Sequence, residues 1–297
     1  MSYNNNLNPL PWYTSINQQN HRKSYAYGEI YPLYTMAGHM LPWQVQRPHR
    51  DARVTSLAIY YENGTLWKNI LSDAASSLSI VSSSYVNELT GATVAYDNII
   101  FNDSAAIAQS QPDGRYYAVM SDGTDIWYSE VFTVVQSLSG FLAIEWYDLA
   151  DLVYDKGRIV YGNSGYRNKV YLPTEIGKPD YTFEEDGEDR DGFWFPEKQL
   201  SEKTYHFSFL APEYMCDAMR IIRLSDHITI TDQFGVQYNA DKFLLTPKWL
   251  ENGDLAQVIA EFQTDTVIKK IGHGGSGASG QGDFNGDFNA DFFIVES

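Results

Sequence analysis

Residues 112–134 constrain the fold more than any other stretch, because apolar side chains alternate on both sides of a strong turn signal. The signal is Asp122-Gly123, since Asp-Gly favours the positive φ angles of short hairpin loops. Apolar residues occupy both faces of the predicted strands before the turn, over 115–120, and after it, over 126–135. Strands that are apolar on both faces are typical of a packed interior, so the sequence predicts a mainly β protein.

The composition narrows the functional classes. A net charge of −17 disfavours binding to nucleic acid or to an anionic membrane surface, because both depend on clustered Lys and Arg. The one cysteine, Cys216, excludes an intrachain disulfide and a thiolate metal cluster. No apolar run has the length of a membrane span, and the first residues lack the pattern of a signal peptide. We therefore expect a protein that is made in the cytoplasm and has neither nucleic acid nor membrane as a partner.

The chain divides into segments of different composition. Residues 1–50 are rich in Asn, Pro and Tyr, which predicts an extended arm, with room for a strand or two, that needs a surface to lie on. Residues 51–136 carry short strand patterns with turns between them, which predicts an immunoglobulin-like β-sandwich. Residues 137–271 predict a second β-rich sandwich domain, in which the acidic stretch 184–191 forms a solvated loop. A chain of 297 residues can give each of two domains its own core.

One short helix is expected near 212–223. Pro212 suits the first turn of a helix, where its missing N–H costs nothing. Met215, Met219 and Ile222 then follow at the spacing that places apolar side chains on one stripe. The second domain is therefore predicted to combine strands with a single helix.

Residues 272–297 differ from the rest of the chain. Their first half is rich in glycine, which predicts a flexible linker. Over 283–291, Asp and Asn take the odd positions, and Phe284, Phe288 and Phe292 fall on even ones. This alternation predicts a strand with one aromatic face, and a lone strand is not stable by itself. We therefore expect a C-terminal arm that adds to a sheet of a neighbouring subunit.

A calcium site is the alternative interpretation of this segment. Asp283, Asn285 and Asp287 match the first three ligand positions of an EF-hand loop. The glycine that should follow is Phe288, and the terminal glutamate is Ile294, so the docking strand is preferred. The six histidines also show no zinc-ligand spacing, and no metal site is predicted.

No motif in the sequence indicates catalysis. The chain lacks a Gly-x-Ser-x-Gly motif, a phosphate loop and a dinucleotide fingerprint. Glu130 interrupts an apolar row, and an outward position or a buried pairing with Arg115 is favoured over a catalytic role. A glycosidase pair can be neither found nor excluded among 38 acidic residues. We predict no enzyme and no cofactor, with a hydrolase or a sugar-binding surface as alternatives.

Aromatic side chains in the two arms are the predicted assembly contacts. Such rings bury a large area on contact and are enriched in protein interfaces. The interface residues expected from the sequence are Trp12, Tyr13, Trp43, Phe284, Phe288 and Phe292.

Six short motifs lie within 41–270: Leu41–Pro48, Pro112–Tyr117, Met120–Gly123, Trp127–Phe132, Asn168–Leu172 and Leu255–Lys270. Together they resemble a family of structural proteins of tailed phages and prophages of gut anaerobes. The resemblance implies a virion component of the tail, the baseplate or the head-to-tail connector, with immunoglobulin-like domains repeated around a symmetry axis. It also implies synthesis in the host cytoplasm, and further copies and other virion proteins as partners. A receptor- or carbohydrate-binding tail module is the alternative.

Overall fold

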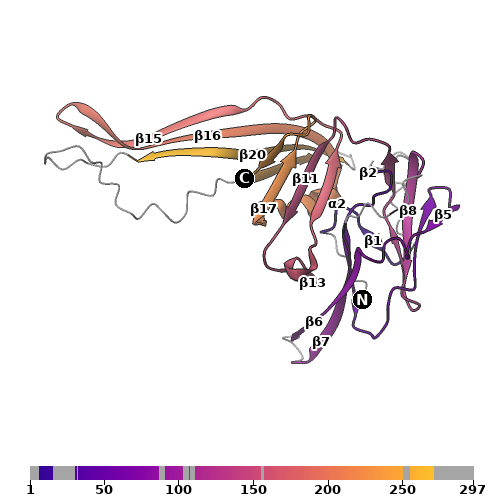
Figure 1. Cartoon of the computed structure of the whole chain (residues 1–297). Coiled ribbons are helices and arrows are strands. Elements are labelled where there is room, and N and C mark those ends of the chain that lie inside the picture. Colours follow the sequence, from indigo (N-terminus) through magenta and orange to yellow (C-terminus); the bar gives the residue numbers. More distant parts are fainter. Residues whose placement is uncertain are drawn as a thin grey trace. The chain divides into compact units, whose positions relative to one another are not determined.

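The computed structural model describes residues 7–15, 31, 33–86, 91–102, 107, 111–154, 157–249 and 255–270. This part of the chain is mainly β and contains a single α-helix, in line with the predicted class (Figure 1). Contacts divide the chain into two compact units. Unit 1 comprises residues 1–182 and 202–266, and unit 2 comprises residues 183–201 and 267–297.

The predicted hairpin lies inside the largest sheet of unit 1. Strand β8 (Gly114–Ser121) pairs with β9 (Ile126–Ser129) and then with β10 (Phe132–Val135), which confirms the two arms. Between these two pairings, residues 117 and 118 of β8 face the three residues 129–131 of the other arm. The extra residue forms a β-bulge between β9 and β10. On its other side β8 pairs with β4 (Ser56–Tyr61), which in turn pairs with β5 (Leu66–Asn69).

The described part of residues 1–50 belongs to the fold instead of forming an extended arm. Strand β1 (Trp12–Tyr13) pairs with β9, and β2 (Leu33–Met36) runs parallel to β10. Strand β3 (Trp43–Pro48) enters the second sheet of unit 1. The physical reason is burial, because most side chains of these strands are inside the protein. Because these strands pair with strands of the same chain, they do not need the surface of another molecule to become ordered.

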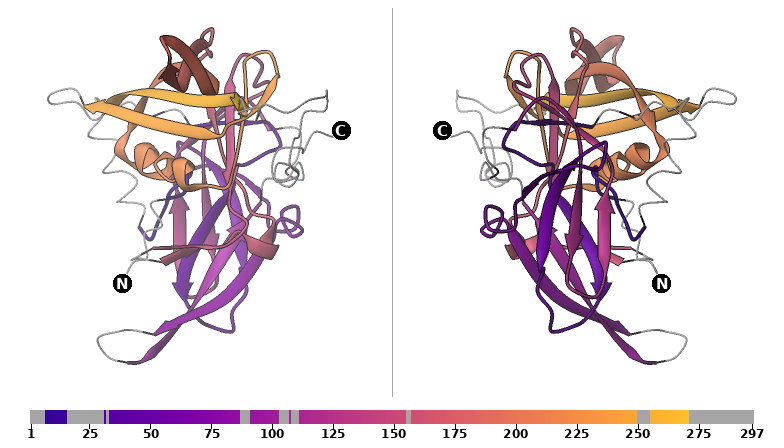
Figure 2. Two further views of the ribbon diagram at one scale, coloured as in Figure 1. Left: turned by 90° about the vertical axis from the view of Figure 1, so that its left-hand side faces the viewer. Right: turned by 90° about the vertical axis from the view of Figure 1, so that its right-hand side faces the viewer.

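The second sheet has the order β3-β7-β6. Strands β6 (Leu78–Val86) and β7 (Thr93–Phe101) lie side by side over nine residues each (Figure 2). The third sheet has the order β14-β11-β17-β18, and β12 and β13 form a separate pair. The bounds of these strands are Leu142–Tyr147 for β11, Leu152–Tyr154 for β12, Gly157–Ile159 for β13, Asn168–Leu172 for β14, His227–Thr231 for β17 and Gln237–Asn239 for β18.

One hydrophobic core runs through unit 1. It joins Trp43 of the second sheet, Tyr116 of the first and Trp146 of the third. The contacts therefore do not divide unit 1 near residue 136, where the sequence predicted a domain boundary. Sheets that share a core act as one block in packing terms.

The longest strands form the fourth sheet, in the order β15-β16-β20-β19. Their bounds are Asp180–Arg190 for β15, Phe193–Pro212 for β16, Lys242–Trp249 for β19 and Leu255–Lys270 for β20. Helix α2 (Glu213–Met219) follows β16 directly, and the 3-10 turns η1 (Gly162–Ser164) and η2 (Ile222–Leu224) complete the elements.

The predicted helix is confirmed over 213–219. Pro212 stands immediately before it in extended conformation, so the chain turns from strand to helix at that residue. Met215, Met219 and Ile222 are fully buried, as their spacing predicted. The stripe therefore anchors α2 and η2 in the core of unit 1.

Candidate functional site

The described part of unit 2 is a three-stranded ribbon, which is the candidate functional surface. The ribbon comprises residues 183–190 of β15, 193–201 of β16 and 267–270 of β20. Asp191 and Gly192 join β15 to β16 with positive φ angles of 52° and 78°. Two consecutive positive φ angles are typical of the type I′ turn that matches the twist of a hairpin. The predicted solvated loop over 184–191 is therefore wrong, because its residues pair along β15 up to this turn.

Large apolar side chains are exposed along this ribbon. Phe193 is 70% exposed and Trp194 50% exposed, next to the hairpin turn. On the neighbouring strands Phe183, Val267 and Ile268 are also exposed. Burying one such side chain contributes about 1.5–3 kcal/mol, and exposed apolar patches mark interaction sites. The ribbon therefore presents unused hydrophobic area to any surface that meets it.

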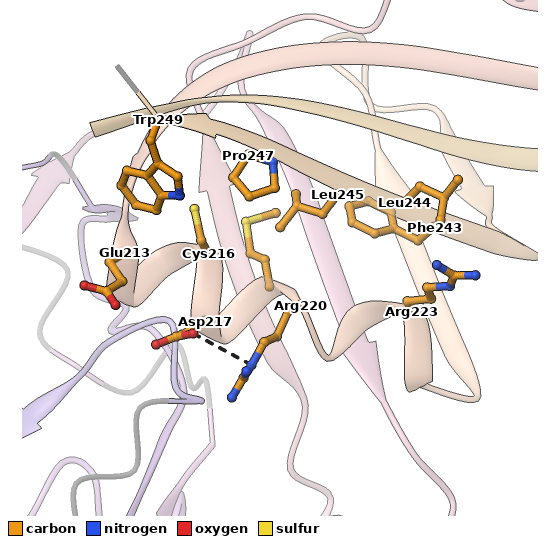
Figure 3. Close-up of a pocket in the computed structure, with 11 residues that line it drawn as sticks. Glu213, Cys216, Asp217, Arg220, Arg223, Phe243, Leu244, Leu245, Pro247 and Trp249 are labelled. Atoms are coloured by element: carbon orange, nitrogen blue, oxygen red, sulfur yellow. Dashed lines mark ion pairs between the residues drawn. The ribbon is translucent and has the colours of Figure 1, made fainter. Parts of the chain in front are cut away.

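A groove in unit 1 lies between helix α2 with η2 and strand β19 (Figure 3). It has a volume of about 370 Å³, and Phe243, Leu245 and Pro247 supply apolar lining from the strand. Carboxylate and guanidinium groups lie along the helical side, where Arg220 Nε approaches Asp217 Oδ1 at 3.8 Å. The lining residues are Glu213, Cys216, Asp217, Met219, Arg220, Arg223, Phe243, Leu244, Leu245, Pro247 and Trp249.

Cys216 is the nucleophilic group of this groove, and its environment makes it inert. The thiol points from α2 toward β19 (Figure 3) and is buried. Burial raises the pKa of Cys216 to about 11, and the nearby carboxyl of Asp217 acts in the same direction. A thiol with this pKa stays protonated at neutral pH, whereas the thiolate is the reactive form. The groove thus offers contact area without an activated nucleophile.

A buried charge cluster joins the first two sheets of unit 1. It connects the turn at Asp122, between β8 and β9, with strands β3 and β7 of the second sheet. Arg47 of β3 lies 3.2 Å from Asp97 of β7 and also binds Asp122. All three side chains are at most 1% exposed. Arg50 adds a second guanidinium at 3.6 Å from Asp122 and at 2.5 Å from Asp125. The cluster thus places two arginines against the carboxylates of one strand and one turn.

Hydrogen bonds hold the carboxylates of this cluster in the charged form. Burial raises the pKa of Asp97, but hydrogen bonds from His49 and Ser82, together with Arg47, outweigh it and leave that pKa below its ordinary value. The pKa of Asp122 is also lowered, because the N–H groups of Asp125 and Thr124 and the arginines outweigh its burial.

Asp122 therefore has two functions in the fold. Its Oδ1 accepts hydrogen bonds from the N–H groups of Thr124, at 2.9 Å, and Asp125, at 2.8 Å. These two bonds close the predicted turn. Its Oδ2 binds Arg47. The sequence indicated only the turn, because nothing local to 121–125 shows that an arginine of β3 will lie beside it. We interpret the cluster as structural, since it links strands within a buried region.

The structure places Trp12, Tyr13 and Trp43 in the core instead of at an assembly contact. Trp12 and Trp43 have ring centroids 4.5 Å apart, and Trp43 stacks on Phe101 at 5.5 Å. All three predicted interface residues are at most 5% exposed, so their side chains have almost no surface for a neighbour. The three C-terminal residues of the prediction, Phe284, Phe288 and Phe292, lie outside the described residues.

Glu130 occupies the β-bulge and is buried. Its carboxylate accepts a hydrogen bond from the Tyr13 hydroxyl at 3.0 Å and one from the Val131 N–H at 3.1 Å. Arg115, the partner suggested by the sequence, lies instead 3.8 Å from Glu62. Glu130 therefore ties β1 to the bulge, which explains why an acid interrupts the apolar row.

Within the described ranges, no group of three or more His, Cys, Asp or Glu side chains could hold a metal ion. Among the same residues, no helix combines the length and apolar character that crossing a membrane requires. No known protein-family model matches this chain, and none of the curated proteins is significantly similar to it in sequence.

Proposed function

We propose that the chain is a non-enzymatic structural component of a phage virion, located in the tail, the baseplate or the head-to-tail connector. Unit 1 would act as a rigid block, and the ribbon of unit 2 would hold further copies of the chain or other virion proteins. The exposure of Phe193 and Trp194 on the ribbon carries this proposal. Aromatic anchors of this kind supply much of the binding energy in protein interfaces.

Two further parts of the proposal concern the fold and the C-terminal segment. We propose that the strands of unit 1 belong to immunoglobulin-like sandwiches, which the antiparallel sheets β4-β8 and β3-β7-β6 support. The resemblance of the short motifs to phage structural proteins supports the virion setting. Residues 272–297, with their alternating aromatic residues, are proposed to dock on a neighbouring subunit.

Mass spectrometry of purified particles tests the proposed function. We expect the protein in a fixed stoichiometric ratio to the other structural proteins of the particle. Absence of the protein from intact particles would overturn the proposal. A C-terminal deletion of residues 272–297 should leave the circular dichroism of the folded protein unchanged but reduce its incorporation.

A ribbon variant makes the test specific. Trp194→Ser removes an exposed aromatic side chain from the ribbon and should lower incorporation into particles while leaving the thermal unfolding of unit 1 unchanged. Phe234→Ser is the matched control, because Phe234 is 82% exposed but lies in a turn of unit 1. Equal incorporation of both variants would contradict the assigned surface.

A receptor- or carbohydrate-binding module is the second candidate. The exposed rings of Phe193 and Trp194 favour it, because aromatic faces near a hairpin turn can stack on sugars. A glycan array with the wild-type protein and Trp194→Ala distinguishes the two functions. Glycan binding that Trp194→Ala abolishes, with normal incorporation into particles, would favour the binding module.

A further inference from the structure

We propose that copies of this chain join edge to edge through the ribbon, so that β15 of one copy pairs with the end of β20 of the next. This inference rests on the proposed assembly function and names the surface that carries it. Each copy would pair through its β15 edge with one neighbour and through its β20 edge with another. Backbone hydrogen bonds across the two strands would then continue the sheet from copy to copy.

Both edges are open in the described part of the chain. Strand β19 pairs with β20 only from Ala256 to Gln263, so residues 267–270 extend beyond the end of β19. On the opposite side of the ribbon, β15 is the end strand of the sheet. No described strand pairs with either of these two edges. An unpaired strand edge presents a row of N–H and C=O groups that can bind another strand.

The charges of the two edges are opposite. Strand β15 carries five acidic residues and one basic residue over 183–190, whereas β20 ends in Lys269 and Lys270. Opposite charges on neighbouring strands attract, and like charges directly opposite one another are destabilising. Two β15 edges therefore repel each other, and so do two β20 ends. Only the mixed pairing of β15 with β20 is electrostatically favourable.

The apolar residues of the ribbon support the same pairing. Phe183 on β15 and Val267 on β20 are 63% and 64% exposed, and Ile268 follows next to Val267. A strand added at either edge would cover part of these side chains. The mixed pairing thus combines backbone bonding, charge attraction and apolar burial in one contact.

The pairing joins two different edges, so each copy can pair with two different neighbours. Used in this way the contact is heterologous, and heterologous contacts close into rings when the rotation between copies allows it, and otherwise extend as filaments. The opposite charges on the two edges thereby favour head-to-tail association over a dimer in which two identical edges pair. This geometry is the one that a component repeated around a particle axis requires.

Charge exchange tests the inference directly. One variant combines Glu184→Lys with Asp186→Lys on β15, and the other combines Lys269→Glu with Lys270→Glu on β20. Each variant alone should self-associate at least about tenfold more weakly than wild type at low ionic strength, since the β15 variant neutralises its edge and the β20 variant turns attraction into repulsion. An equimolar mixture of the two should recover association, because the unchanged β20 end of the first variant then meets the unchanged β15 edge of the second. Sedimentation velocity and native mass spectrometry measure both effects.

Matched controls separate the edges from net charge. Glu175→Lys with Asp241→Lys makes the same charge change as the β15 variant, and Arg53→Glu with Lys178→Glu matches the β20 variant. All four control positions are exposed and lie in unit 1. The controls should associate like wild type. Circular dichroism of every variant shows whether the fold is intact.

Three results would overturn the inference. The first is a wild-type protein that stays monomeric at every concentration tested. The second is wild-type association by both edge variants, or a mixture that associates no better than either variant alone. The third is association that requires residues 272–297 and ignores the edge charges, which would make the C-terminal segment the true occupant of the β20 edge. Mass spectrometry of particles is independent of all three, so the proposed function can stand when this inference fails.

Discussion

Unit 1 and the ribbon of unit 2 contain similar aromatic residues in opposite environments. Trp43 and Trp146 of unit 1 are fully buried, whereas Phe193 and Trp194 of the ribbon are at least half exposed. In unit 1 each sheet contributes to a shared core. Composition alone therefore does not separate core residues from contact residues, because the arrangement of the strands decides which apolar side chains are covered.

Charged residues show the same contrast. The Arg47–Asp97 pair of unit 1 is buried and tied by several hydrogen bonds, whereas the acidic residues of β15 in the ribbon are largely exposed. A buried pair must stay intact because each uncompensated charge would be costly. An exposed row of charges affects contacts with other molecules more than it affects the fold.

The largest difference in unfolding free energy is expected between substitutions of a buried and an exposed tryptophan. Trp43→Ala should lower the free energy of unfolding by about 3–5 kcal/mol, because it leaves a cavity against Phe101. Trp194→Ala should change the same quantity by less than about 0.5 kcal/mol, the range of ordinary surface substitutions. Chemical denaturation followed by circular dichroism measures both. Similar losses for the two variants would show that Trp194 is as important to the fold as Trp43.

The next effect concerns the buried charge cluster. Arg47→Ala leaves Asp97 and Asp122 without their shared guanidinium and should cost about 3 kcal/mol or more of unfolding free energy. Arg220→Ala is the control, because Arg220 is 68% exposed beside Asp217 and should cost less than about 1 kcal/mol. A small loss for Arg47→Ala would show that the cluster is not essential to unit 1.

Acid should weaken unit 1 through the same carboxylates. The pKa values of Asp97 and Asp122 are lowered in the folded protein, so their contribution to stability is fully present above the ordinary aspartate pKa. It is lost as the pH falls through the lowered values, which places the decline below about pH 4. Denaturation curves between pH 7 and pH 3 measure it. Asp122→Asn should flatten the decline, and an unchanged pH dependence would contradict this origin.

The smallest expected effect compares two turn glycines. Gly64 of unit 1 and Gly192 of unit 2 both have positive φ angles, and an added Cβ would meet nothing within 4 Å at either position. Alanine at each site should therefore cost about 1 kcal/mol through backbone strain alone. Gly64→Ala should lower the melting temperature of unit 1. Gly192→Ala should instead speed amide exchange in the ribbon and leave that melting temperature unchanged, as hydrogen exchange can verify.

Local patterns in the sequence predicted the elements whose partners are near in the chain. The hairpin around Asp122 and the helix after Pro212 both follow from turn and spacing signals within about ten residues. The β-bulge at Glu130 was visible only as an acid in an apolar row, because its partner Tyr13 lies 117 residues away. Asp191-Gly192 was a usable hairpin signal for β15, but the acidic residues before it suggested a loop.

Long-range pairing explains what sequence reasoning missed. The composition of residues 1–50 indicates poor order in isolation, yet β1, β2 and β3 each find a partner strand beyond residue 90. No local signal encodes such partners. The ribbon surface was missed for the same reason, since exposure of Phe193 and Trp194 depends on which strands surround them. The predicted contacts of the C-terminal segment stay a prediction.

The contact between Asn8 and Tyr166 has a consequence for biosynthesis. The Tyr166 hydroxyl oxygen lies 3.3 Å from Asn8 Oδ1, across 158 residues of sequence. A ribosome adds about 5–20 residues per second, so the N-terminus waits roughly 8–30 s before its partner has been translated. During most of that interval β1 and β2 lack β9 and β10, so the unfinished chain exposes strand edges that the folded protein covers.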